Sequence, residues 1–223
     1  MLNIALDGPS GSGKSTVSDI VAERLNILHL NTGAIYRAIG YYFDSQNIDV
    51  RDKDLVISKL SDIHIEIKFL SGVQRIYLNN VDVSDNLYSM RISDICSISA
   101  AYIEVRELVA KIQREVADTY DVIMEGRDIC SHVLPNAKYK FYLDASARNR
   151  AIRRINDSKN KDKLTIDDLE RVTLQIEERD RRDMERDVCP LKKVDDAIYI
   201  NCDELSANEV ADIIVTTVLK EVL

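Results

Sequence analysis

The sequence predicts an α/β fold in which a parallel sheet lies between two layers of helices. Short apolar runs alternate with amphipathic helical segments along most of the 223 residues, and this alternation is typical of parallel sheets covered on both faces. One group of short strands interrupts the alternation and predicts a small antiparallel insertion. The length suits one large domain, or a core domain with insertions, and is ample for a buried core.

The first unit of the alternation is a strand, a glycine-rich turn and a helix. The strand is predicted over Asn3–Asp7 and the helix over Ser15–Leu25, where aliphatic residues recur at helical spacing. Ligands of such sheets bind at the carboxyl ends of the strands. The further predicted strands are Ile27–Leu30, Asp121–Glu125, Tyr139–Leu143 and Ala197–Ile200, and the helices include Ile103–Thr119 and Ser206–Leu219.

The antiparallel insertion is predicted from three short strands and the turns between them. The strands are His64–Phe69, Gln74–Leu78 and Asp82–Val83, and Ser71-Gly72 and Asn79-Asn80 are the turn signals.

A polar segment and a helix start are predicted in the last third of the chain. Residues Asn156–Lys163 have no apolar period and predict a mobile loop. Thr165 with Asp168 three residues later fits a capping box, so a helix is expected to follow.

Composition excludes several classes of protein. With 30 basic and 38 acidic residues the net charge is -8, which argues against a broad nucleic-acid or anionic-membrane surface. No apolar run approaches the ~18 residues that a membrane helix needs, so an unexported, cytoplasmic protein is expected. Cysteines 96, 130, 189 and 202 lie far apart and are predicted to be reduced thiols.

Residues 8–16, GPSGSGKST, match G-x-x-x-x-G-K-[ST] between a predicted strand and a predicted helix. Glycines let backbone N–H groups converge on phosphate oxygens, and the helix start adds its own N–H groups and dipole. The alternative, a glycine turn that binds nothing, does not account for both pattern and context. The motif predicts a P-loop NTPase fold that binds a nucleoside triphosphate.

Within this loop the chemistry assigns three side chains. Lys14 would neutralise the β- and γ-phosphates, Ser15 would be a Mg²⁺ ligand because a hard cation takes oxygen donors, and Thr16 would contact the remaining phosphate oxygens. The predicted ATP-binding residues are Gly8, Pro9, Ser10, Gly11, Ser12, Gly13, Lys14, Ser15 and Thr16.

The motifs of a regulatory GTPase are missing from the sequence. No glycine has Asp three positions before it, and the closest match to N-K-x-D, residues 160–163, ends in Lys. Arginines on several elements instead suit a second anionic substrate that faces the triphosphate.

Further motifs resemble those of the bacterial cytidylate kinase family in order and spacing from end to end of the chain. They are NTGAIYR (31–37), EGRDI (125–129), RDRRD (179–183), Arg186, CPL (189–191) and DDA (195–197).

The resemblance implies a nucleoside monophosphate kinase fold in three parts. They are a core (about 1–31, 103–147 and 188–223), a monophosphate-binding insertion (about 32–102) and a helical lid (about 148–187). It implies the reaction of ATP, with Mg²⁺, and CMP or dCMP to give ADP and CDP or dCDP. It does not imply an oligomer, and a monomer is expected.

The resemblance also implies how the monophosphate is held. Arg37, Arg127 and Arg186 would bind it, with the Thr32 hydroxyl beside them. Three guanidinium forks suit a dianion that must approach another polyanion.

Base and ribose contacts are implied in the same way. Ser97, Arg106 and Asp128 match the cytosine-reading positions, and Asp183 matches the acceptor for ribose hydroxyls. Asp128 would accept from the cytosine N4 amino group and disfavour the uracil carbonyl.

Catalysis is expected from positioning and charge neutralisation, without a general base. The predicted catalytic residues are Lys14, Arg127 and Arg181, and those of the lid are Arg153, Arg154 and Arg179.

Simpler interpretations stay open. Arg37 alone could be a helix surface residue, and Asp128 could cap a helix. Most of residues 148–187 would be exposed, salt-bridged helix. A broader pyrimidine kinase, or a nucleotide-dependent switch without transfer, are the competing functions.

Three departures from the family pattern could shift substrate preference. Asn31 stands where Asp is usual, Cys130-Ser131 where Gly-Thr is usual, and Ile103-Glu104 precede Arg106 without the usual proline.

Overall fold

The computed structural model describes residues 1–156 and 165–220. The chain forms two compact units, Met1–His29 with Tyr120–Leu223, and Leu30–Thr119. The three-part division expected from the sequence stays a prediction. It assigned residues 103–119 to the core, whereas they belong to the second compact unit.

A five-stranded sheet in the order β2-β6-β1-β7-β8 forms the framework of the fold. Strands β6 and β7 each pair in parallel with β1, and β8 pairs in parallel with β7. These strands lie within one residue of their predicted ends, which confirms the predicted parallel sheet. Their bounds are β1 (Asn3–Asp7), β2 (Leu28–Asn31), β6 (Val122–Gly126), β7 (Tyr139–Asp144) and β8 (Ile198–Asn201).

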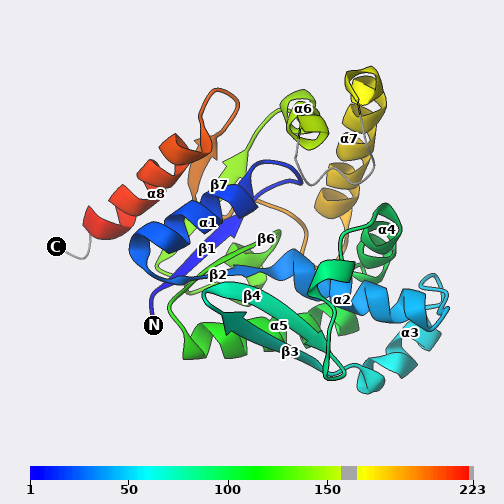
Figure 1. Ribbon diagram of the computed structural model, residues 1–223. Helices are drawn as coiled ribbons and strands as arrows, with labels where there is room; N and C mark the ends of the chain where they lie inside the picture. The colour runs from blue at the N-terminus through cyan, green and yellow to red at the C-terminus, as the bar shows by residue number, and fades with distance from the viewer. Residues whose placement is uncertain (157–164, 221–223) are drawn as a thin grey trace. The chain divides into compact units, whose positions relative to one another are not determined.

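Helices α1 (Lys14–Leu25) and α8 (Ala207–Lys220) lie side by side along one face of this sheet (Figure 1). Their aliphatic side chains form one core cluster with those of the strands, Ile123 of β6 included. The adjacent residue Val122, whose side chain points to the opposite face, is also fully buried. The sheet is therefore covered on both faces, as the alternating pattern predicts.

Two further helices belong to the first unit. Helices α6 (Ala147–Asn156) and α7 (Leu169–Glu185) pack through a small apolar cluster around Val172. The predicted capping box at Thr165 is confirmed, and a 3₁₀ turn over Ile166–Asp168 leads into α7. The loop predicted at 156–163 lies outside the described residues, except for Asn156 at the end of α6.

The second unit contains the predicted antiparallel insertion, strands β3 (Ile65–Leu70), β4 (Val73–Leu78) and β5 (Val81–Asp82). Both hairpins turn through two residues with positive φ: Ser71-Gly72 at 52° and 80°, and Asn79-Asn80 at 48° and 69°. Turns of this kind match the right-handed strand twist, and Gly and Asn adopt them at little cost.

Four helices complete the second unit: α2 (Thr32–Ser45), α3 (Lys53–Lys59), α4 (Met90–Ser99) and α5 (Ile103–Thr119). Helices α2 and α4 pack closely at Gly40, where an added Cβ would lie 3.2 Å from the Ile92 oxygen and the Cys96 nitrogen. The sequence predicted α5 but neither α3 nor α4. Short 3₁₀ turns lie at Leu60–Asp62 and Ser84–Asn86.

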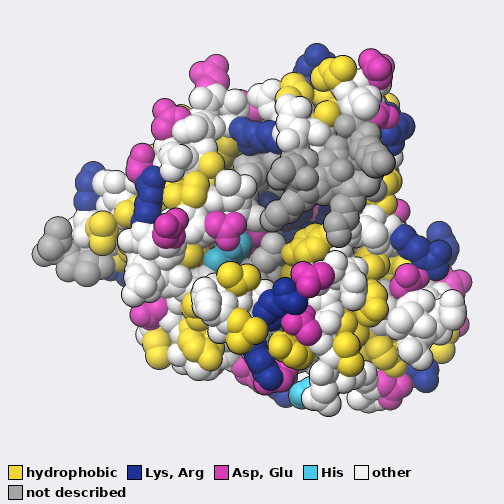
Figure 2. Space-filling view, in the orientation of Figure 1, with side chains coloured by type: hydrophobic (Ala, Val, Ile, Leu, Met, Phe, Trp, Pro, Cys, Tyr) yellow, Lys and Arg dark blue, Asp and Glu magenta, His cyan; other side chains and the backbone are white. Residues whose placement is uncertain are grey.

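Acidic and basic side chains are interspersed over the face shown in Figure 2. None of the helices within residues 1–156 and 165–220 has the length and apolar character needed to span a membrane. All four cysteines are free, which agrees with the prediction of reduced thiols.

Candidate active site

The glycine-rich loop between β1 and α1 has the backbone that a phosphate cradle needs. Gly8, Gly11 and Gly13 have φ of 150°, 79° and 95°, which L-residues rarely adopt. At Gly8 an added Cβ would lie 2.0 Å from the carbonyl oxygen of Leu143, so the loop passes directly against β7. No described side chain caps α1 at Gly13, which leaves the first N–H groups of the helix for an anion.

Lys14 lies buried with its side chain folded back along this loop. Its Nζ donates to the Pro9 carbonyl at 2.7 Å and to the Ser12 hydroxyl at 3.3 Å. Burial and the nearby charge of Arg127 lower the pKa of Lys14 to about 7, against the opposing charge of Glu125. An anion bound in the loop would hold the proton on this amine.

Ser15 and Thr16 are exposed in the first turn of α1. The Ser15 hydroxyl donates to Glu125 Oε1 at 2.5 Å. Burial would raise the pKa of Glu125, but His29 and Lys14 together with the Ser15 hydroxyl keep it below its usual value, so Glu125 is a carboxylate. A hydroxyl oxygen beside a buried carboxylate is a donor set that suits a hard divalent cation.

Protein ligands for a metal are otherwise sparse. Among the described residues, no group of three or more His, Cys, Asp or Glu side chains could hold a metal ion. A cation at Ser15 would therefore depend on the phosphates of its nucleotide, as Mg²⁺ commonly does.

Asp7, at the carboxyl end of β1, fixes the segment that follows β6. Its carboxylate accepts the N–H groups of Ile129 at 2.9 Å and Cys130 at 2.8 Å, at the start of a π-helical turn over residues 129–133. Burial, with the charge of Asp128 adding to it, raises the pKa of Asp7 to about 6. Cys130 has no positive φ and is buried, so this departure from the family pattern fits without backbone strain.

Arg127 and Asp128 precede that turn, and Asp128 is buried. Arg127 Nε donates to Asp183 Oδ2 at 3.1 Å, and Arg186 Nη1 lies 3.7 Å from Asp183 Oδ1. All three side chains are less than one-fifth exposed. Burial would raise the pKa of Asp183, but Arg127, Arg179 and Arg186 lower it. The structure thus places a compact cluster of arginines around one carboxylate.

Helix α6 also contacts the phosphate loop. Arg150 donates to the Ser10 carbonyl at 3.0 Å and pairs with Asp180 of α7 at 2.6 Å. Arg153 donates to the Ser12 carbonyl at 3.3 Å and to the Cys202 carbonyl. The prediction chose Arg153 and missed Arg150, whose buried pairing is a long-range feature.

The remaining lid arginines differ in their surroundings. The charge of Arg179 lowers the pKa of both Lys14 and Asp183, so Arg179 lies within electrostatic range of both groups. Arg154 is half-buried on α6. Arg181 is 58% exposed and pairs along α7 with Glu178 and Glu185. Its predicted catalytic role stays a prediction.

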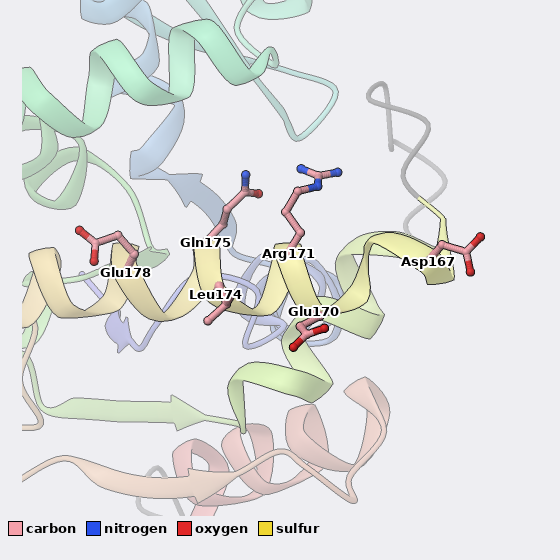
Figure 3. Close-up of a pocket in the computed structure, with 6 residues that line it drawn as sticks. All are labelled: Asp167, Glu170, Arg171, Leu174, Gln175 and Glu178. Carbon is pink, nitrogen blue, oxygen red and sulfur yellow. The ribbon is translucent and has the colours of Figure 1, made fainter.

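A shallow hollow beside α7 contains none of the predicted site residues. Arg171 and Gln175 point to one side of the helix there, and Glu170 and Leu174 to the other (Figure 3). The hollow is lined by Asp167, Glu170, Arg171, Leu174, Gln175 and Glu178.

In the second unit, the start of α2 is built around Asn31. Its side chain accepts from the Ala34 N–H at 3.1 Å as an N-cap, so Asn in place of the family's Asp keeps the capping contact. Thr32 is buried in the first turn. At Gly33 an added Cβ would lie 3.4 Å from Arg37 Nη1, so the missing side chain leaves room for that guanidinium.

Aromatic rings hold the two predicted arginines of this unit. The Arg37 guanidinium lies 4.9 Å from the centroid of the Tyr88 ring, and its buried Nη1 has no hydrogen-bond partner among the described residues. Arg106, 1% exposed, lies 5.4 Å from the Tyr36 ring and donates to the Ala100 carbonyl at 3.0 Å. These arginines are not free surface residues.

The predicted residues therefore fall in both units. The first unit brings together the phosphate loop, Arg127, Asp183 and Arg186, and the second contains Thr32, Arg37 and Arg106, with Ser97 half-buried on α4. Sequence reasoning assigned no role to Asp7 or Glu125, although both lie at the carboxyl ends of adjacent parallel strands, a position that marks ligand sites.

Comparison with known proteins decides the family, because the model of one family, cytidylate kinase, matches residues 4–220. The chain belongs to the cytidylate kinase family. A cytidylate kinase of Caldicellulosiruptor bescii is 40% identical over 209 residues, 94% of this chain and 92% of that protein. One of Bacillus subtilis is 40% identical over 217 residues, 97% of this chain and 96% of that protein. The predicted family is thus confirmed, and the chain is a kinase.

The fold is found again in distant structures. The crystal structure of an uncharacterized protein from Eubacterium ventriosum superposes with a TM-score of 0.51 at 13% identity, over 98% of each chain. This likeness concerns the fold alone.

Proposed function

We propose that this member of the cytidylate kinase family transfers the γ-phosphoryl group of ATP to CMP and dCMP. The observation that carries the proposal is the buried cluster of Arg127, Asp183 and Arg186 in the same unit as the phosphate loop. A phosphate loop alone needs no such cluster, whereas a second anionic substrate does. The names of the relatives supply the base, cytosine.

ATP would lie in the loop of residues 8–16, with Lys14 between its β- and γ-phosphates. The Ser15 hydroxyl would hold Mg²⁺, for which the adjoining Glu125 carboxylate makes the site suitable. When bound, the ion neutralises phosphate charge.

CMP would be bound by its phosphate and its base. Arg37 suits a phosphate, because the Tyr88 ring supports its guanidinium and its Nη1 has no hydrogen-bond partner among the described residues. Arg127 and Arg186 would exchange their contacts with Asp183 for the phosphate, leaving Asp183 for the ribose hydroxyls. Ser97, Arg106 and Asp128 would read cytosine.

The chain's residues would catalyse transfer by position and charge. The attacking phosphate oxygen is ionised near neutral pH, so no general base is required. Lys14, Arg127 and a lid arginine would surround the transferring group and stabilise its charge. Arg153 and Arg154 would adjust as the lid closes and excludes water.

The proposal includes the finer expectations from the sequence. These are a core, a monophosphate-binding part and a lid, a monomer in the cytoplasm, and no nucleic-acid partner.

A coupled assay of ADP release tests the function, with Mg²⁺, ATP and each of CMP, dCMP, UMP, AMP and GMP. Turnover is expected to be strongest with CMP and dCMP. Equal turnover with UMP would support a broader pyrimidine kinase and remove the role of Asp128. If no monophosphate stimulates turnover, a nucleotide-dependent switch replaces the kinase proposal.

A further inference from the structure

A line of four polar side chains runs from the surface of the first unit to the phosphate loop. His29, in β2, has its Nδ1 2.7 Å from Asp19 Oδ1 of α1 and its Nε2 3.4 Å from Glu125 Oε1 of β6. The same Glu125 oxygen accepts the Ser15 hydroxyl at 2.5 Å. The line therefore connects an exposed carboxylate to the side chain expected to hold Mg²⁺.

Exposure falls along the line, from Asp19 at the surface to the buried Glu125 carboxylate. The Asp19 side chain is 71% exposed, the His29 side chain 12% and the Glu125 side chain 6%. Asp19 fixes one ring nitrogen from the outside, which orients the other nitrogen toward the buried Glu125. A histidine whose second nitrogen is fixed by a carboxylate commonly orients the group that its first nitrogen meets.

We propose that His29 is a positioning residue: anchored by Asp19, its ring holds the Glu125 carboxylate against the Ser15 hydroxyl and so sets the affinity for the magnesium-bound nucleotide. The proposal rests on the proposed function only in taking Mg²⁺ with a nucleotide as the ligand. It concerns the phosphate loop and not the choice of monophosphate.

Electrostatics supports this arrangement. Burial opposes the charged imidazole, but the hydrogen bond with Asp19 and the charges of Asp19 and Glu125 outweigh it and raise the pKa of His29 to about 9. The charged ring offsets the repulsion between Asp19 and Glu125 and leaves a buried carboxylate beside Lys14. Without the ring, the Glu125 carboxylate would lose a partner on the side away from the loop.

Replacing His29 with a ring that cannot ionise distinguishes the effect of filling the space from the effect of the two ring nitrogens. The variants are His29→Phe, which keeps a planar aromatic ring but no nitrogen, and His29→Gln, whose side-chain amide can still donate toward Glu125. His64→Phe is the matched control, because His64 is exposed in the other unit. ADP binding is measured by calorimetry with the whole chain, once with Mg²⁺ and once with EDTA.

His29→Phe is expected to weaken Mg²⁺·ADP binding about tenfold, as loss of a supporting group behind a metal site does. Binding of metal-free ADP should change less than twofold, and His29→Gln should recover at least half of the loss on a logarithmic scale. Equal weakening with and without Mg²⁺, unchanged binding in both, or no recovery in His29→Gln would overturn the proposal.

Two readouts guard against misfolding and against failure of the proposed function. Circular dichroism and the melting temperature identify a variant that does not fold, and His29→Gln then decides the outcome. The unmodified chain is assayed with CMP in parallel. If the unmodified chain does not turn over CMP but His29→Phe still weakens only Mg²⁺·ADP binding, the proposed kinase function is contradicted and the proposed role of His29 stands.

Discussion

The two units hold their arginines in different ways. In the first unit, Arg127 and Arg186 meet the carboxylate of Asp183. In the second, Arg37 and Arg106 lie over tyrosine rings. An ion pair occupies donors that an anionic ligand would need, whereas the Tyr88 ring supports the Arg37 guanidinium and its Nη1 has no hydrogen-bond partner among the described residues. A phosphate that bound at Arg127 would therefore displace the Asp183 carboxylate, whereas one that bound at Arg37 would meet the unpartnered Nη1.

The largest expected effect concerns Lys14, whose contacts are to the loop itself. Lys14→Ala should lower kcat about a thousandfold, because it removes the amine proposed to neutralise the β- and γ-phosphates of ATP. Steady-state kinetics with ATP and CMP measures this, and the exposed Lys192→Ala serves as control. A fall in kcat of less than tenfold would show that the loop backbone and the bound Mg²⁺ neutralise the phosphates without Lys14.

Removing the charge of Asp183 in the first unit should lower both stability and activity. Asp183→Asn should lower the free energy of unfolding by about 3 kcal/mol, because it leaves buried guanidinium groups without their anion. Since the pKa of Asp183 is lowered from 3.8 in the folded chain, this loss should be present at neutral pH and fade as the solution is acidified.

Urea unfolding at pH 7 and at pH 3 measures the Asp183 effect. Glu185→Gln, which alters only an exposed ion pair with Arg181, is the matched control and should change stability by less than about 1 kcal/mol. Equal effects of the two substitutions would remove the contrast between the cluster and an ordinary surface pair.

The pH dependence of stability tests a further charge of the first unit, that of the His29 ring. The pKa of His29 is raised from 6.5 to about 9 in the folded chain. Its contribution is therefore full below pH 6.5 and is lost as the pH rises through about 9, on the order of 2 kcal/mol. His29→Phe should flatten the unfolding free energy between pH 6.5 and 9, and His64→Phe should leave the slope unchanged. An unchanged slope in His29→Phe would count against a charged ring.

The smallest effect is expected in the second unit. Tyr88→Leu removes the face beneath Arg37, a contact worth about 0.5–1 kcal/mol. The KM for CMP should rise about threefold while kcat and the KM for ATP stay unchanged. Tyr120→Leu, at an exposed tyrosine of the first unit, is the control. A fall in kcat alone would mean that the ring does more than orient Arg37.

Much of the fold could be predicted because its signals are local. The strands of the sheet follow from apolar runs, the hairpins from Ser71-Gly72 and Asn79-Asn80, and the phosphate loop from glycines whose positive φ the structure confirms. The capping box at Thr165 is likewise a contact between residues three apart.

What could not be predicted depends on contacts distant in sequence. The π-helical turn after Asp128 is held by Asp7, more than a hundred residues earlier. Helix α4 is short and only weakly amphipathic by its sequence, and close packing on Gly40 of α2 determines it. His29 gave no signal of its own, because a histidine in an apolar strand is ordinary until its partners are known.

Arg150 has a mechanical consequence. This one buried guanidinium donates to the Ala145 and Ser10 carbonyls and pairs with Asp180, so it fastens the phosphate loop to both α6 and α7. A single amino group has neither the planar fork nor the reach to serve all three acceptors. Arg150 therefore links the phosphate loop directly to α7. A displacement of α7 would pull on the loop backbone through this side chain, even when no nucleotide is bound.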